Sequence, residues 1–247
     1  MNGPAEPAAP PPGDLGPLQA LGRVARIFYA PRAASAEIRE RPNWVFPLLL
    51  SVLFSFLLWG ALFARPEWQQ ALRQSIAAAP AKLGELEKVQ TLKAMQVAAT
   101  VMALAAPILG NLFLAMLLWG IATLREGKAP FVTVFSFEVH AQMVTVVPQA
   151  IGLGVLVASR GGSLADAGSG IPFSLASLLP AAGVPAAARG LASAVDLFSV
   201  WYWALVLVGL PIVTSVPARR LRFPILVLWL ASVIARAVTL TLAVSQP

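Results

Sequence analysis

Ionisable side chains inside apolar segments are the residues of this chain that could carry chemistry. Glu138, His140 and Arg236 each interrupt an apolar run, and Asp196 stands directly before another. Ionisable groups are costly in lipid, so those that persist within membrane segments are often functional. Asn111 is the most polar residue inside its own apolar run. These five residues are the candidate functional polar groups of the chain.

Glu138 and His140 form the sharpest pair, because a carboxylate and an imidazole could relay protons or ions. Positions two apart on a helix point about 200° away from each other. The two side chains should therefore not converge, whereas Glu138 and Gln142 share one helix face. We favour a structural, hydrogen-bonded role at the membrane boundary, with a proton or ion relay as the alternative.

Asp196 and Arg236 also have structural interpretations. Asp196 opens an apolar run, where its carboxylate can cap the free amides of a helix N-terminus. Arg236 can extend its guanidinium outward or pair with a carboxylate. Asp196 is the nearest acidic partner by depth, so we favour a structural ion pair over a substrate site.

The chain offers no recognisable catalytic set. It contains no cysteine and a single histidine, whereas a zinc site needs at least about three protein ligands. His-Glu-x-x-His, Gly-x-Ser-x-Gly and P-loop motifs are absent from the sequence. Gly152 and Gly154 lie in an apolar run, which indicates close helix packing rather than a nucleotide loop. We expect no catalytic, cofactor-binding or metal-binding residues, and we expect no enzyme.

The composition is that of a membrane protein. Hydrophobic residues make up 58% of the chain and charged residues only 12%, against about a quarter charged in a typical soluble domain. The apolar runs are long and unbroken, so the fold class is an all-α, polytopic bundle rather than a barrel. The net charge of +7 comes from basic residues beside these runs. It therefore indicates topology and attraction to anionic lipid, not nucleic-acid binding.

Three regions follow along the chain. Residues 1–17 form a Pro/Ala-rich tail that we expect to be disordered. Residues 18–42 are expected to form cytoplasmic, interfacial amphipathic helices. Residues 43–247 form a five-span membrane domain, and Asn43 is a candidate cap for its first helix. The spans are expected at about residues 44–63, 97–124, 141–159, 197–218 and 223–244.

The first amphipathic segment has two possible positions. Its apolar positions recur at helical spacing, with Arg23 and Arg26 off that face. The helix could lie among the lipid headgroups, or it could pack on the protein's own spans. The apolar face comprises Leu18, Leu21, Val24, Ala25 and Phe28.

The basic residues predict the orientation of the spans. The two short basic turns, near residues 125–128 and 219–222, fall on the same side as the N-terminal region. Basic loops favour the cytoplasm. The N-terminus should therefore be cytoplasmic and the C-terminus outside.

Several short motifs resemble the Yip domain family, the Ypt-interacting proteins and their bacterial relatives. They are Phe28 with Pro31, the run Ile-Arg-Glu-Arg-Pro-Asn-Trp at residues 38–44, Gly127 before a span with Pro148, and Val-Asp-Leu-Phe-Ser-Val-Trp at residues 195–201. The resemblance covers roughly residues 27–244 and implies five spans with a cytoplasmic N-terminus. In eukaryotes this family is linked to vesicle trafficking, partner GTPases and membrane-shaping proteins.

The sequence thus predicts a non-enzymatic scaffold or organiser, in the inner membrane of a bacterium. Its N-terminal region would engage protein partners or lipid, and the chain could form a homo-oligomer. The alternative is a small transporter or channel-like subunit with a polar path through the membrane. A working surface is expected between Leu18 and Pro42, beside the first span.

Overall fold

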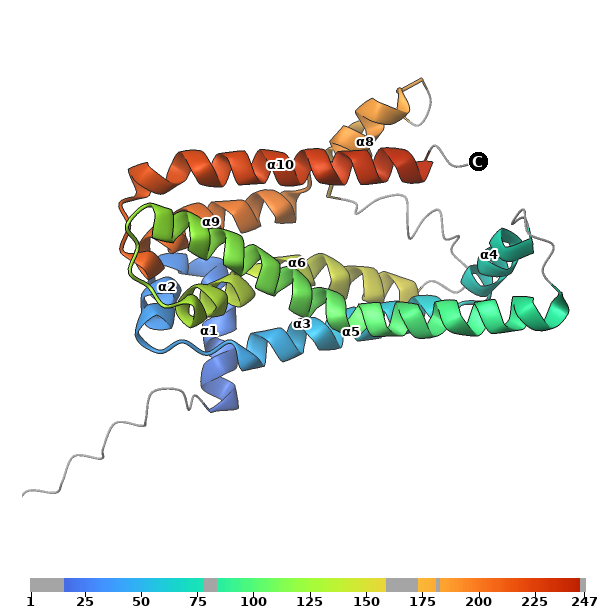
Figure 1. The fold of residues 1–247 in the computed structure, drawn as a ribbon, viewed down its shortest axis with the longest axis horizontal. Helices are drawn as coiled ribbons and strands as arrows, with labels where there is room; N and C mark the ends of the chain where they lie inside the picture. The colour runs from blue at the N-terminus through green and yellow to red at the C-terminus, as the bar shows by residue number, and fades with distance from the viewer. Residues whose placement is uncertain (1–15, 78–83, 159–172, 181–182, 245–247) are drawn as a thin grey trace, which may run out of the picture.

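In the computed structural model, the described residues form a bundle of α-helices (Figure 1). The structure describes residues 16–77, 84–158, 173–180 and 183–244. The tail predicted to be disordered lies outside them, except for Gly16 and Pro17. Five helices are long and apolar enough to cross a bilayer, which confirms the all-α membrane fold class. They are α3 (Val45–Phe63), α5 (Glu85–Leu124), α6 (Phe131–Ala158), α9 (Leu197–Thr214) and α10 (Ala218–Val244).

Two short helices, α1 (Pro17–Tyr29) and α2 (Pro31–Glu40), form an N-terminal pair at one end of the bundle. A proline starts each helix, where its missing N–H leaves no hydrogen bond unmade. α1 runs across the direction of the spans (Figure 1). Ile27, Ala34 and Ile38 are fully buried in the bundle's main core. The pair therefore packs on the protein's own spans, and its position among lipid headgroups stays a prediction.

The first span begins without the cap predicted from the sequence. Trp44 occupies the N-cap position of α3, and no side chain caps the helix there. Asn43 instead uses its backbone N–H, which donates to Ser136 Oγ at 2.9 Å. The prediction that Asn43 caps the first span was therefore wrong. A tertiary contact with α6 holds the backbone of Asn43 instead.

The second long helix, α5, is 40 residues long and so extends roughly 60 Å at about 1.5 Å per residue. This exceeds a bilayer's hydrocarbon core of about 30 Å, and α5 begins well before the predicted span at residue 97. It continues through Pro107, whose missing N–H leaves the carbonyl of Ala103 without its helical donor. Ser55 of α3 supplies that donor, at 2.8 Å. At the far end, α4 (Pro66–Ala77) packs beside α5.

The third long helix, α6, begins at Phe131 rather than near Ala141, where the third span was predicted. The stretch expected to lie at the interface is instead deeply buried, including Glu138 and His140. Polar residues made this stretch look unsuited to a span. Hydrogen-bond partners inside the bundle lower the free-energy cost of burying these polar residues, so the stretch can form part of a span.

The last two spans meet in a tight turn. α9 ends at Thr214 because Ser215 adopts a left-handed conformation, with φ of 58°. α10 starts at Ala218, so the basic residues 219–222 belong to its first turns and not to a separate loop. On the other side of α10 lies α8 (Ala186–Ala194), preceded by a 3-10 helix, η1 (Leu175–Leu178).

Candidate functional site

The most buried ionisable group in the described chain is paired across two spans. Tyr202 of α9 donates its hydroxyl to Glu138 Oε2 of α6 at 2.6 Å. Glu138 is 0% exposed and Tyr202 is 4% exposed. Tyr202 was not among the candidate residues named from the sequence. It could have been noticed there, because it is one of only two tyrosines and lies in the middle of an apolar run.

His140 has a separate partner. Its Nδ1 lies 2.7 Å from the carbonyl oxygen of Ser136, one turn earlier in α6. Glu138 and His140 therefore face different neighbours, as their spacing predicted. The pair forms no common site.

One face of α6 carries hydrogen-bond acceptors for which the described residues provide no donor. Glu138, Gln142 and Gln149 each hold a buried Oε1 that has no hydrogen-bond partner among the described residues. Their spacing of four and seven residues places them along one side of the helix. We call these three residues the α6 polar stripe. An unsatisfied buried acceptor costs about 1–3 kcal/mol, so the stripe suits water or a hydrogen-bond donor.

The N-terminal pair is locked by a buried arginine. Arg23 donates to the carbonyl oxygen of Arg41 at 2.6 Å, and its Nε lies 3.8 Å from Glu37. Arg26 also forms an ion pair with Glu37. Desolvation lowers the pKa of Arg23, and the charge of Glu37 raises it. Arg23 was expected to lie off the apolar face of this helix, but it is buried in the bundle together with Ala20, Val24 and Ile27.

The pair meets α6 and α9 at a close crossing. A Cβ added to Gly209 would lie 2.2 Å from the Phe137 ring and 2.6 Å from Ser35 Oγ. Glycine is therefore required at this point, because any side chain would push α9 away from α2 and α6.

Asp196 and Arg236 form a second polar site, at the start of α9. Asp196 Oδ1 accepts from the Ser199 backbone N–H at 2.8 Å, which confirms the N-cap. Asp196 Oδ2 lies 3.1 Å from Arg236 NH1, which confirms the ion pair. The same junction is held by a β-bridge between Ser174 and Asp196. Every described contact of this carboxylate is structural.

Asn111 stands alone on α5. Its Nδ2 donates to the Pro107 carbonyl at 2.6 Å, and its buried Oδ1 has no partner within the described parts of the chain. Of the five candidate residues, the structure brings together only Asp196 and Arg236, and the functional role of each candidate stays a prediction. No described residue lies within 4 Å of a Cβ added at Gly152 or Gly154, so the described part of the chain does not show the close packing expected there.

The described residues bring together no group of three or more metal-ligating side chains. Two pairs of polar groups, Glu138 with Tyr202 and Asp196 with Arg236, instead join neighbouring helices. A comparison with protein-family models gives a match to the Yip1 domain over residues 25–240. The chain belongs to the Yip1 domain family. This confirms the resemblance noted in the motifs at residues 38–44 and 195–201.

The Yip1 match begins inside α1 and ends near the end of α10. It therefore includes the last turn of α1, all of α2, the first four long helices and α10 as far as residue 240. Searches of curated proteins and of solved structures found no match. Yip1 family proteins are not known as enzymes.

Proposed function

We propose that this Yip1 family protein is a non-enzymatic scaffold of the membrane, and that its N-terminal pair is a docking platform for a protein partner. The observation that carries the proposal is the contrast between the two sides of α1. One side is locked into the bundle through Ile27 and Arg23. The other exposes Leu18 (84%) and Tyr29 (74%).

The exposed side of α1 forms a continuous apolar strip. Leu18, Leu21, Ala25 and Tyr29 follow one another at helical spacing and are all exposed. We call these four residues the α1 strip. Apolar strips of this kind receive an amphipathic helix or another apolar surface of a partner.

Rigid attachment makes the α1 strip suitable for binding. Arg23, Ile27 and Ile38 fix the helix before any partner arrives. A pre-ordered surface loses less conformational freedom on binding, so more of its contact energy appears as affinity. The polar pairs inside the bundle serve this purpose by holding α6 and α9 beneath the platform.

In-cell crosslinking of the full-length protein tests the proposal. Replacing Leu18, Leu21 and Tyr29 with serine should remove the protein partners that the wild type captures. Serine at two exposed leucines of the opposite end, Leu178 and Leu191, provides the matched control. Capture that survives the first set of changes, or that both sets abolish equally, would refute partner docking by the α1 strip.

A transporter or channel-like subunit is the second candidate, favoured by the α6 polar stripe. Three unsatisfied acceptors on one helix face could line a hydrated path that ends at Glu138. His140 and Arg236 are engaged elsewhere, so the path would differ from the one expected from the sequence. Replacing Gln142 and Gln149 with leucine should then reduce flux in proteoliposomes. Wild-type vesicles that show no flux for protons, cations or small polar solutes would exclude this function.

A further inference from the structure

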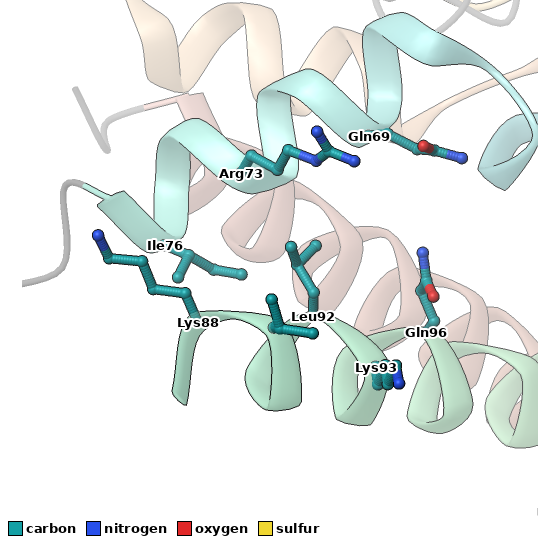
Figure 2. A pocket seen from close by; sticks show the side chains of 8 residues that line it. Gln69, Arg73, Ile76, Lys88, Leu92, Lys93 and Gln96 are labelled. Atoms are coloured by element: carbon teal, nitrogen blue, oxygen red, sulfur yellow. The ribbon is translucent and has the colours of Figure 1, made fainter. Parts of the chain in front are cut away.

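A basic pocket lies between α4 and α5 (Figure 2), at the end of the bundle opposite the N-terminal pair (Figure 1). Its volume is about 470 Å³, and none of the eight lining side chains is acidic. Arg73 comes from α4, and Lys88 and Lys93 come from the start of α5. Within the described parts of the chain, neither Arg73 nor Lys93 has a carboxylate within ion-pair distance. The pocket therefore favours an anion.

The remaining lining groups suit a ligand that is only partly polar. Gln69 and Gln96 supply amides from the two helices, and Gln69 also donates to the Phe63 carbonyl at 3.2 Å. Ile76 and Leu92 lie between the helices (Figure 2). An inorganic anion would use the basic groups alone. An amphiphile with an anionic head would also use this apolar surface.

The pocket lies where the apolar surface of α5 ends. Val97 and Val101 are exposed and apolar, and they follow Gln96 directly along the helix. The nearby Phe63 ring packs against Trp59 and Trp68. Aromatic groups of this kind concentrate at the membrane–water interface, which places the pocket at the depth of the lipid headgroups.

We propose that the α4–α5 pocket binds the phosphate of an anionic phospholipid from the adjacent leaflet. Arg73 and Lys93 hold the phosphate oxygens through charge-assisted hydrogen bonds. The amides of Gln69 and Gln96 meet the headgroup's hydroxyl or ester oxygens. Ile76 and Leu92 contact the first carbons of an acyl chain. The bound lipid would join α4 to α5 and fix the end of the scaffold that lies away from α1.

Photo-crosslinking to defined lipids tests this assignment. Full-length protein is reconstituted in phosphatidylcholine vesicles that carry photoactivatable phosphatidylglycerol or, in parallel, photoactivatable phosphatidylcholine. Adducts are then mapped to peptides of α4 and α5. Phosphatidylglycerol should label these peptides preferentially. Arg73→Gln with Lys93→Gln should lower that labelling by roughly thirtyfold, since each of the two basic residues near a charged membrane surface contributes about 1 kcal/mol.

Two matched variants separate the site from general charge effects. Lys128→Gln with Arg222→Gln removes the same charge from exposed positions at the other end of the bundle, and should leave the labelling unchanged. Arg73→Lys with Lys93→Arg keeps the charge, and this variant should retain most of the labelling. Equal labelling by both lipids would overturn the proposal, as would an equal loss in the control variant. So would loss of labelling on adding inorganic phosphate, because the occupant would then be a free anion.

Discussion

At the scale of single residues, several buried polar groups of this protein pair with partners on a neighbouring helix. Glu138 and Tyr202 share a 2.6 Å hydrogen bond between α6 and α9. Ser55 satisfies the carbonyl that Pro107 leaves free in α5. Neither lipid nor the apolar core can replace such a bond. Each pair therefore fixes the register of two helices as well as their contact.

Removing the hydroxyl of Tyr202 should destabilise the bundle. Tyr202→Phe leaves the Glu138 carboxyl buried without a donor, at a cost of about 1–2 kcal/mol. The melting temperature in detergent should fall accordingly. Combining Tyr202→Phe with Glu138→Leu should cost less than the two single changes added together, because no polar group is then left unpaired. Strict additivity would show that the hydrogen bond contributes nothing.

Gly209 should tolerate no side chain. An alanine there would place its Cβ 2.2 Å from the Phe137 ring, and overpacking of this kind typically costs about 1–3 kcal/mol. Gly120→Ala is the matched control, because nothing lies within 4 Å of its added Cβ. Thermal unfolding in detergent should separate the two variants. Equal stability of both would contradict the close crossing of α2, α6 and α9.

At the scale of elements, the start of α9 combines two roles in one carboxylate. Asp196 caps the helix through Ser199 and pairs with Arg236 of α10. The cap satisfies a free amide, whereas the ion pair joins two helices. Arg236 is partly exposed, so water and salt weaken the pair. The cap should therefore contribute more to stability than the pair does.

Two substitutions at Asp196 can separate these roles. Asp196→Asn keeps an oxygen for the cap and removes the charge, so its loss of stability should stay below about 1 kcal/mol. Asp196→Ala removes both interactions and should cost about 1 kcal/mol more. Arg236→Gln should match Asp196→Asn. Thermal melts at low and high salt provide the measurement, and salt should reduce only the contribution of the ion pair. If Asp196→Asn and Asp196→Ala are equally unstable, the cap is unimportant.

At the scale of the whole molecule, the N-terminal pair belongs to the folded core. Ile27, Ala34 and Ile38 share a cluster with residues of α9 and α10. The buried core lies mainly at this end, whereas α5 projects well beyond it at the other (Figure 1). The bundle is thus compact where α1 presents its strip and more open where α4 and α5 form the basic pocket.

Deleting residues 16–41 should therefore damage the bundle itself. The deletion exposes the core surfaces of α6 and α9 that Ile27 and Ile38 cover, and large losses of buried apolar area destabilise a fold by several kcal/mol, about 25 cal/mol per Å². Detergent-solubilised protein should aggregate or elute earlier in gel filtration. A deletion of residues 1–15 alone should not have this effect. A truncated bundle that remains monodisperse and melts like the wild type would show that the pair is dispensable.

The predicted orientation can be measured directly, because the chain has no cysteine. Single cysteines at Lys128 and Gln90, both exposed, lie at opposite ends of α5. A membrane-impermeant maleimide should label Gln90→Cys in intact cells, and Lys128→Cys only after the membrane is opened. The reverse pattern would place the N-terminus outside, despite the basic turns.

The sequence by itself determined the environment, the number of spans and the family of this protein. Long apolar runs leave lipid as their only stable surroundings, and the helical backbone follows from the lack of water to satisfy its polar groups. The local N-cap at Asp196 was also predictable, because a cap depends on a few neighbouring residues. The Asp196–Arg236 pair followed from the depth at which each residue should lie.

Only the tertiary structure decided which side of α1 is buried, where α6 begins and which donor meets Glu138. Each of these depends on a partner distant in the chain: Arg41 for Arg23, and Tyr202 for Glu138. A polar residue such as Glu138 in an apolar run argues against a span until its partner is known. Pairing removes most of the cost of burial, and the pairing exists only once the helices have packed.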